Sequence, residues 1–293
     1  MERLSGKDRI YMGIVYFCVT LMALAALYPM VYVLSMSISR PQAVIAREVY
    51  LWPVGFSTSA YTRVFQNSAI WRYFGNSFWY TIVGTFFMVV VTVLAAYPIS
   101  RRKFFIRKSL NKFYIFTLFF SGGLIPFYLI IRSTGLMNNR WALVLPFLVE
   151  TWNLVIARSF FDTLPEELYE AAKIDGADEF RLMWHIAFPL SRTLFAVLAL
   201  FYGLANWNGW FFASLLLNDV LHPLQVFLRR VLTAASPEAM MAWAQHGVET
   251  TEVLSMIQIQ YAIIIVATVP ILLLYPFLQR YFEKGVMIGA VKG

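Results

Sequence analysis

The stretch FWYTIVGTFFMVVVTVLAAYPI, residues 78–99, contains no charged side chain, and the basic stretch RRKFFIRK follows it at residues 101–108. A helix of about 20 mostly apolar residues is long enough to cross the hydrocarbon core of a bilayer. Basic residues beside such a helix usually mark its cytoplasmic end. The stretch therefore predicts a transmembrane helix, and with it a helical membrane protein.

The composition of the whole chain supports this prediction. The 293 residues are 60% hydrophobic and only 14% charged, whereas a soluble domain has about 45–50% apolar and about 25% charged residues. So few polar residues could not cover the surface of one globule. Disorder, a secreted soluble enzyme and a disulfide scaffold are excluded, the last because Cys18 is the single cysteine. The net charge of +8 fits basic residues that flank membrane spans better than a nucleic-acid partner.

Hydropathy predicts an all-α, polytopic membrane protein with six transmembrane helices and no appended soluble domain, so that residues 1–293 form a single transmembrane domain. The predicted spans are residues 12–36, 78–99, 113–131, 141–160, 194–217 and 261–282. The first follows a basic start but is much longer than the apolar region of a signal peptide, so we expect it to be retained. In the third, Ser121-Gly122-Gly123 before Pro126 indicates a kinked or closely packed helix.

The distribution of basic residues predicts the orientation of these spans. Of the 24 Lys and Arg residues, 16 fall in the N-terminus, the second and fourth loops and the C-terminus, and 8 fall in the other three loops. Basic residues are enriched on the cytoplasmic side. Both termini are therefore expected in the cytoplasm.

The fourth loop, residues 159–192, differs from the others because it holds seven of the 16 acidic residues. Pro165 and the two glutamates after it suit a first helical turn. Leu168, Ala171 and Ala172 then share one apolar face, and Asp175-Gly176 ends the helix. The loop thus predicts a helix–turn–helix on the cytoplasmic surface.

The second helix of this hairpin is expected to begin at Asp175, which can act as its N-cap. Its apolar stripe would consist of Ala177, Phe180, Met183, Trp184 and Ala187. The hairpin could pack against the underside of its own bundle. Alternatively, its small-residue face and acidic rim could dock into the groove of a partner. The residues alone leave both interpretations open.

The spacing of this loop resembles the EAA loop of ABC importer permeases. Glu170-Ala171-Ala172, three residues, Gly176, nine residues and Ile186-Ala187-Phe188-Pro189 reproduce the pattern, except that Phe188 stands where the family has Leu. The resemblance implies that the loop forms coupling helices that sit in a cleft of an ATPase subunit. It further implies that Glu170 pairs with a basic residue there and that Gly176 permits the turn. The coupling residues it assigns are Glu170, Ala171, Ala172, Gly176, Ile186 and Pro189.

Two other stretches resemble the carbohydrate-uptake branch of that family. QRYFEKG at residues 279–285 and GAVKG at residues 289–293 are similar to the tail of the maltose-permease second-subunit class, although Glu283 replaces an apolar residue. SGGLIP at residues 121–126 is similar to a subgroup that imports oligosaccharides from polysaccharide breakdown. The overall likeness, rather than a discrete motif, is to permeases of alginate importers.

The resemblance implies the chain's function and partners. The chain would be the transmembrane subunit of an ATP-driven importer for oligosaccharides, with alginate among the candidates, in a bacterial inner membrane. One coupling loop per chain implies a homologous second permease, two ATPase subunits that bind ATP and Mg²⁺, and a periplasmic or lipid-anchored sugar-binding protein. The chain itself would bind no cofactor, metal or nucleic acid.

Motifs that would give the chain its own chemistry are absent from the sequence. No G-x-x-x-x-G-K-[ST] is present to hold nucleotide phosphates. The three histidines, His185, His222 and His246, lack metal-ligand spacing. The chain is therefore not expected to be an enzyme. The alternative function is an ion-coupled secondary carrier, which would need intramembrane carboxylates, and Glu150 is the residue that favours it.

Polar residues within the predicted spans mark a candidate substrate path. The fifth span contains Asn206-Trp207-Asn208-Gly209-Trp210, and the fourth contains Asn153. Amides can bond sugar hydroxyls, and aromatic rings can stack on sugar faces, so Asn206, Trp207, Asn208, Trp210 and Asn153 are the candidates. The alternative is that the amides bridge helices and the tryptophans anchor at the membrane interface. For Glu150, an internal partner is favoured over a place in the path, because a carboxylate would repel an anionic uronate.

Overall fold

The computed structural model describes residues 6–234 and 257–273. Within these ranges the chain forms two compact units, one of residues 6–68, 228–234 and 257–269 and the other of residues 69–227 and 270–273. The described residues contain no β-strand beyond an isolated bridge between Ser39 and Phe56. The predicted all-α class is confirmed.

The first unit contains the long N-terminal helix. Its helices are α1 (Gly6–Ser37), α2 (Pro41–Ile45), α3 (Ser59–Gln66), the end of α14 (Leu224–Ala234) and most of helix Ile257–Leu273. A small core forms around Met36, Val44 and Val49, and Tyr261 packs against it. The buried Gln258 side chain donates a hydrogen bond to the Ser39 carbonyl. These contacts join the end of α1 to the last described helix.

The second unit carries the loop and the amide cluster that the sequence analysis selected. Its helices are α4 (Ser68–Trp79), α5 (Thr85–Ser100), α6 (Arg107–Phe119), α7 (Leu124–Ser133), α8 (Thr151–Asp162), α9 (Glu166–Ile174), α10 (Glu179–Leu182), α11 (Phe188–Leu190), α12 (Arg192–Asn208), α13 (Phe211–Leu216) and the start of α14. Short 3₁₀ turns lie at Arg140–Leu143, Leu145–Phe147 and Asp219–Leu221, and π-helical turns lie at Tyr80–Gly84 and Met183–Ala187.

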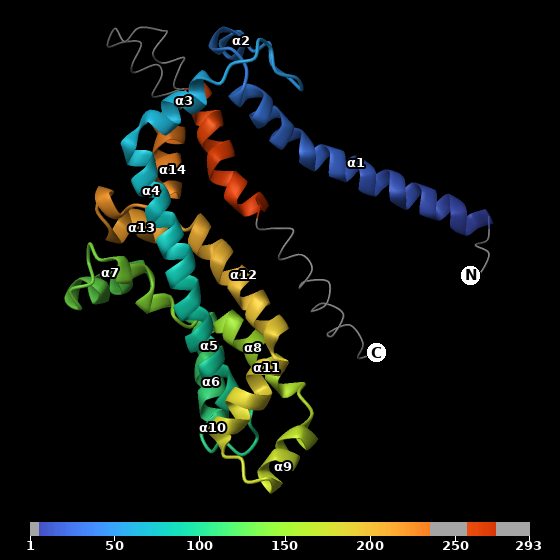
Figure 1. Ribbon diagram of the computed structural model, residues 1–293, viewed down its shortest axis with the longest axis vertical. Helices are drawn as coiled ribbons and strands as arrows, with labels where there is room; N and C mark the ends of the chain where they lie inside the picture. The colour runs from blue at the N-terminus through green and yellow to red at the C-terminus, as the bar shows by residue number, and fades with distance from the viewer. Residues whose placement is uncertain (1–5, 235–256, 274–293) are drawn as a thin grey trace. The chain divides into compact units, whose positions relative to one another are not determined.

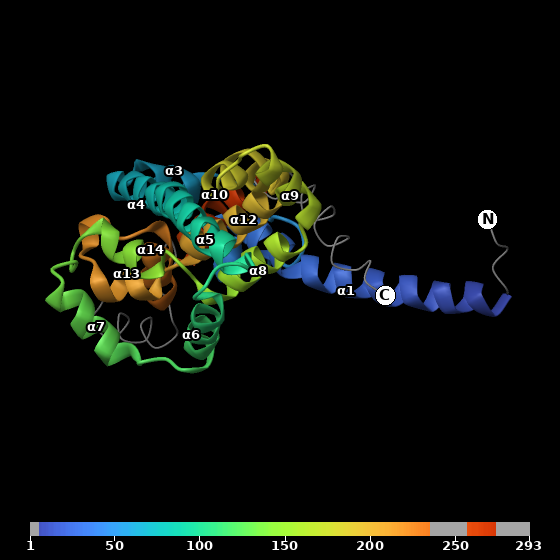
Figure 2. The same cartoon turned by 90° about the horizontal axis from the view of Figure 1, so that it is seen from below.

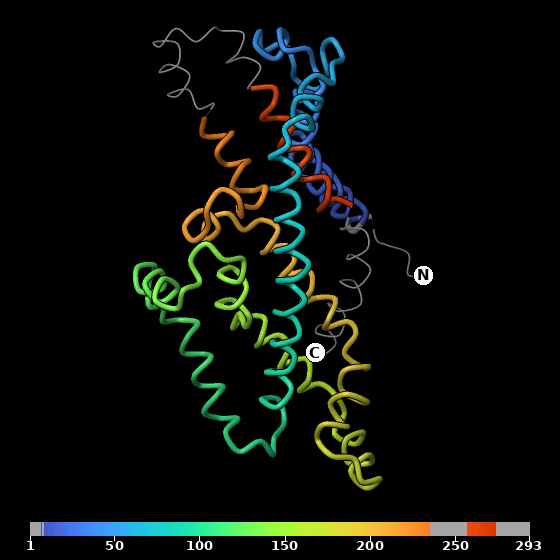
Figure 3. The backbone as a smooth tube through the Cα atoms, turned by 60° about the vertical axis from the view of Figure 1, so that its left-hand side comes forward, coloured from blue at the N-terminus to red at the C-terminus, as the bar shows by residue number. Residues whose placement is uncertain are grey.

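The axis of the second unit is one uninterrupted helix, Ser68–Ser100, made of α4, the π-helical turn and α5 (Figure 3). Helices α8 and α12 pack along α5 (Figures 1 and 2). Ala96 on α5 and Ala157 on α8 are both fully buried in this core, and Leu198 of α12 joins them. Because alanines are small, they let the two helix backbones approach closely.

The third predicted span is broken rather than continuous. Helices α6 and α7 meet at 116° across residues 120–123. Gly123 has φ +85°, a backbone conformation that side chains with a Cβ disfavour. No heavy atom lies within 4 Å of a Cβ placed on Gly122. Of the two predicted explanations for Ser121-Gly122-Gly123, the bend is therefore confirmed, whereas close packing at Gly122 is not seen.

The fourth and fifth predicted spans are also interrupted. The fourth begins with two 3₁₀ turns that meet α8 at 47°, and the prediction of one helix over residues 141–160 is therefore wrong. The fifth is helical in α12 only to Asn208, and α13 starts after Trp210. Gly209 ends the helix because its ψ of 108° is extended.

Two helices among the described residues are long and apolar enough to cross a membrane by themselves, Arg9–Ser37 and Ser68–Ser100. Three bent pairs would each make one further span, and helix Ile257–Leu273 is shorter. The predicted sixth span extends to residue 282 and the family-like tail covers residues 279–293, so the end of the span and the whole tail lie outside the described residues. The count of six spans stays a prediction.

Candidate functional site

The predicted helix–turn–helix of the fourth loop is present as α9 and α10, at one end of α5 and α12 (Figure 1). Gly176 lies in the turn with φ +82°. Two backbone bonds close the helix end: Gly176 N–H donates to the Lys173 carbonyl at 3.0 Å, and Ala177 N–H donates to the Ala172 carbonyl at 2.9 Å. A glycine in the left-handed conformation after a helix end is a common C-terminal cap.

The N-cap predicted for the second helix is wrong. Asp175 is the C-cap of α9 rather than the N-cap of α10. Asp178 caps α10, and its carboxylate accepts a hydrogen bond from the Arg181 N–H at 2.7 Å. Asp175 still belongs to the end of α9, and the left-handed turn at Gly176 separates it from α10.

The hairpin has one buried face and one exposed apolar face. Tyr169 and Leu182 are 1% and 0% exposed and belong to the core of the second unit, and Ala172 packs against it. Ile174 and Phe180 are 86% and 66% exposed. The predicted apolar faces are therefore split, because Leu168, Ala171, Phe180 and Trp184 point outward. The interpretation that the hairpin packs against its own bundle is confirmed for the buried face, whereas docking of the exposed face into a partner stays a prediction.

The coupling candidates lie on both faces. Glu170, Ala171, Gly176 and Pro189 are exposed. Ala172 and Ile186 are partly buried and pack against the core. The outer group is therefore open to a partner, and the inner pair holds the hairpin to the unit.

Four ion pairs hold the hairpin and the chain before it, and one of them joins Lys173 of α9 to Glu179 of α10. Arg101 donates to both carboxylate oxygens of Glu166, at 3.1 and 3.2 Å. Asp162, at the end of α8, accepts from Arg107 at 3.2 Å and also pairs with Arg158. Burial raises the pKa of the Tyr169 hydroxyl, although the Arg101 guanidinium acts in the opposite direction. Tyr169 therefore stays neutral and acts as a packed ring.

The second unit also carries a half-open cavity of about 470 Å³ between α5, α8, α12 and α13. The candidate path residues on its wall are Asn153, Asn206, Asn208 and Trp210. The wall further contains Glu150, Tyr80, Tyr202, Met88, Leu143, Phe147, Ala205, Gly209, Phe211, Phe212, Ala213 and Pro223. Amides and aromatic rings therefore converge on one space, as a saccharide site requires.

Asn206 and Asn208 differ in their contacts. The Asn206 amide donates to the Thr85 hydroxyl at 3.2 Å and lies 3.1 Å from the position of a Cβ on Gly84. It therefore bridges α12 to the long helix as well as lining the cavity. Asn208 donates to the Leu204 carbonyl of its own helix, at 2.9 Å, and is exposed. Asn208 has the freer side chain of the two.

Trp207 is not among the residues that line the cavity. Its side chain is 4% exposed and stands edge-on to Phe78 of α4, with ring centres 5.3 Å apart. Consecutive helical residues differ by about 100° around the axis. Since Asn206 and Asn208 lie on the cavity wall, Trp207 between them faces another side of α12. Its ring packs between helices rather than in the cavity.

Glu150 combines the two roles that the sequence left open. Its carboxylate accepts a hydrogen bond from the Asn153 N–H at 2.9 Å and so caps α8. Its own N–H donates to the Tyr202 hydroxyl, which is 2.7 Å from the Thr92 hydroxyl. The internal partner that was favoured is thus a helix end rather than an ion. Glu150 also lines the cavity, and it forms no ion pair with any residue that the structure describes.

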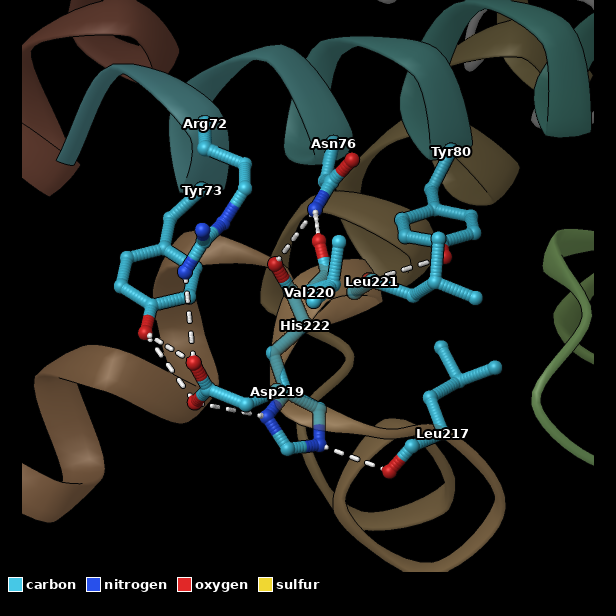
Figure 4. A network of polar contacts seen from close by, with 9 residues as sticks. All are labelled: Arg72, Tyr73, Asn76, Tyr80, Leu217, Asp219, Val220, Leu221 and His222. Atoms are coloured by element: carbon cyan, nitrogen blue, oxygen red, sulfur yellow. Dashed lines mark hydrogen bonds and ion pairs between the residues drawn. The ribbon is translucent and has the colours of Figure 1, made fainter. Parts of the chain in front are cut away.

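A polar network that the sequence did not suggest supports the wall at Tyr80 and Pro223 (Figure 4). Asn76, 2% exposed, donates to the carbonyls of Val220 and His222 at 2.9 and 3.0 Å. The Tyr80 hydroxyl donates to the Leu221 carbonyl at 2.9 Å. The turn before α14 is therefore fixed to the long helix.

Charged groups surround this turn. Asp219 pairs with Arg72 at 3.3 Å and accepts from the Tyr73 hydroxyl at 3.1 Å (Figure 4). Arg140 donates to the Asn76 amide oxygen at 2.9 Å. In the sequence these residues lie about 145 positions from their partners or in another loop. No local pattern could have found them.

Comparison with known proteins identifies the family. Residues 88–288 match the family described as the binding-protein-dependent transport system inner membrane component. The chain belongs to this family. The matched range begins within α5 and includes the hairpin and most of the cavity wall.

Individual relatives of this permease match almost its whole length. It is 40% identical over 271 residues to protein LplC of Bacillus subtilis (strain 168), covering 90% of this chain and 89% of the relative. It is 36% identical to the polygalacturonan/rhamnogalacturonan transport system permease protein YtcP of the same organism, covering 98% and 100%. A chain in the crystal structure of a bacterial ABC transporter involved in the import of the acidic polysaccharide alginate superposes with TM-score 0.86 and 32% identity, covering 96% of this permease and 100% of that chain.

These matches confirm the resemblance found in the sequence. The permease is a component of a transporter and not an enzyme. Membership of a binding-protein-dependent transport family also decides against the ion-coupled carrier.

Proposed function

We propose that this permease is the transmembrane subunit of an ATP-driven importer of oligosaccharides and that its cavity is half of the translocation path. The observation that carries the proposal is the convergence of Asn153, Asn208 and Trp210 on one cavity wall. The amides provide donors and acceptors for hydroxyls, and the ring provides a face for the sugar C–H groups. The saccharide named for the relative YtcP points to the same class of substrate.

The permease would lie in a bacterial inner membrane with six spans and both termini in the cytoplasm, as a single transmembrane domain. Cytoplasmic loops are enriched in basic residues, and the segment 101–112 after α5 contains six of them. The hairpin of α9 and α10 would lie on the same side. This orientation points its exposed face toward the cytoplasm, where ATP is available.

The exposed face of the hairpin would dock on an ATPase subunit. Glu170 would pair with a basic residue of that subunit, and the apolar side chains of Ile174 and Phe180 would be covered by it. The ATP and Mg²⁺ would be held by two such subunits. A homologous second permease would supply the other half of the path, and a sugar-binding protein would deliver the substrate. Closure of the ATPase dimer would draw the two hairpins together and open the path outward.

The charged residues of the cavity lining indicate which parts of a substrate it can bind. Its lining residues, all within the described part of the chain, include one carboxylate, Glu150, and no Lys or Arg. This half of the path therefore suits the hydroxyl-bearing parts of a sugar. For an acidic oligosaccharide, of the kind named for the alginate and polygalacturonan transporters, the cationic contacts would come from the second permease.

Uptake by the assembled transporter tests the proposal. The permease is reconstituted with its second permease, the ATPase and the binding protein, and the ATP-dependent accumulation of labelled oligogalacturonate, oligoalginate and a neutral oligosaccharide is measured. We expect ATP-dependent accumulation of at least one of the three. Accumulation of none, by a complex that hydrolyses ATP, would contradict an oligosaccharide importer.

A further inference from the structure

The side chain directly after α5 makes a polar contact with the start of α9. Arg101 is the residue directly after α5, and its guanidinium forms the two-pronged pair with Glu166. The same guanidinium carbon lies 3.8 Å from the centre of the Tyr169 ring. Glu166 and Tyr169 are three positions apart and therefore share one face of α9. One cation thus contacts both a carboxylate and a ring of the hairpin.

The surroundings of this contact strengthen it. The Arg101 side chain is only 13% exposed, and the Tyr169 ring is buried in the core of the second unit. Partial burial reduces the screening that makes most surface ion pairs weak. A planar guanidinium can pair with two oxygens and stack on a ring at once, whereas a lysine ammonium cannot reproduce this geometry. The contact therefore fixes the direction of α9 relative to α5 as well as their distance.

The two elements that Arg101 joins have different tasks. Helix α9 carries Glu170 and Ile174 on its exposed face, where the ATPase is expected. The long helix that ends at Ser100 carries Tyr80 and Met88 on the cavity wall. It is uninterrupted from these residues to Ser100. The guanidinium lies between the docking surface and the helix that lines the path.

We propose that Arg101 is a positioning residue that transmits displacement of α9 to the long helix, so that the cavity responds when the hairpin moves. The inference rests on the proposed function. Apolar packing of Tyr169, Ala172 and Leu182 resists separation of the hairpin from the unit, but such packing is not directional. The fork between Arg101 and Glu166 adds a directional constraint, because two parallel hydrogen bonds fix an orientation.

The test follows the cavity directly and needs no substrate. Cys18 is the single cysteine, so Cys18→Ser followed by Ala205→Cys places one thiol on the cavity wall. The rate at which a maleimide labels this thiol is measured in the assembled transporter, without nucleotide and with ATP plus vanadate. Arg101→Lys is compared with Arg102→Lys, a neighbouring basic residue that is exposed and forms no ion pair with the described residues. ATP hydrolysis and co-purification of the ATPase are measured for each.

Arg101→Lys should keep the ATPase bound and leave basal hydrolysis intact. The nucleotide-dependent change in its labelling rate should fall at least about fivefold, because allosteric coupling typically begins at about that size. Arg102→Lys should match the parent. Glu166→Gln keeps the contact of Arg101 with the Tyr169 ring and weakens its pair with residue 166. Its nucleotide-dependent change in labelling rate should therefore fall less than that of Arg101→Lys, and Glu167→Gln is its control. An undiminished response in Arg101→Lys would overturn the inference, as would loss of the ATPase, which would make Arg101 a support of docking. A parent that binds no ATPase would instead refute the proposed function.

Discussion

At the residue scale, two neighbours at the end of α12 lie in different environments. Trp207 is buried against Phe78, whereas Asn208 is exposed on the cavity wall. Trp207→Ala removes a large buried ring and should lower the stability by about 3–5 kcal/mol. Asn208→Ala should leave the melting temperature unchanged and raise the oligosaccharide concentration for half-maximal ATPase stimulation, since one hydrogen bond is worth about 1 kcal/mol. Unchanged half-saturation in Asn208→Ala would remove this residue from the path.

Gly176 gives a second prediction at this scale. A Cβ on Gly176 meets no atom within 4 Å, so substitution acts through the backbone conformation at φ +82° alone. The left-handed conformation costs most residues about 1–2 kcal/mol, and asparagine tolerates it better. Gly176→Ala should therefore lower the melting temperature of the assembled transporter more than Gly176→Asn does. Equal effects of the two changes would show that the turn does not depend on this conformation.

At the element scale, the turn at residues 217–223 depends on Asn76 of α4. Asn76→Ala leaves the carbonyls of Val220 and His222 without their donor, and the buried His222 carbonyl alone would cost about 1–3 kcal/mol. Arg72→Ala removes an ion pair that is about half exposed, which is worth about 1 kcal/mol at most. Thermal unfolding should therefore show a large loss for Asn76→Ala and a small one for Arg72→Ala. The reverse order would contradict the role given to the network.

The sequence predicted the helical class, the hairpin and its turn because each depends on local pattern. Apolar runs mark helices that must satisfy their own backbone groups in a bilayer, and Gly176 marks a turn. The 3₁₀ turns that begin the fourth span were missed because residues 141–149 are apolar throughout, although Pro146 among them disfavours a continuous helix. The Arg101 contact and the Asn76 network were also missed, since both join distant segments. Trp207 was grouped with its neighbours by adjacency, whereas the structure separates them.

At the scale of the whole molecule, the orientation of the spans is the first prediction. Reporter fusions after Lys112 and after Lys173 should both report a cytoplasmic location, and a fusion after Arg140 should report the outside. The reason is the excess of basic residues in the second and fourth loops. A cytoplasmic signal at Arg140 would break the six-span arrangement.

The measurement that tests the central claim most directly is ATP hydrolysis by the assembled transporter, in the presence of its binding protein, as a function of oligosaccharide concentration. Glu170 is exposed on the outer face of the hairpin and is not among the residues that line the cavity. If the hairpin docks as proposed, Glu170→Lys would replace an attraction to the ATPase with a repulsion. The parent transporter should show hydrolysis that rises with oligosaccharide, and Glu170→Lys should lose this rise while its melting temperature stays the same. Normal stimulation in Glu170→Lys would contradict the assignment of residues 159–192 as the coupling element.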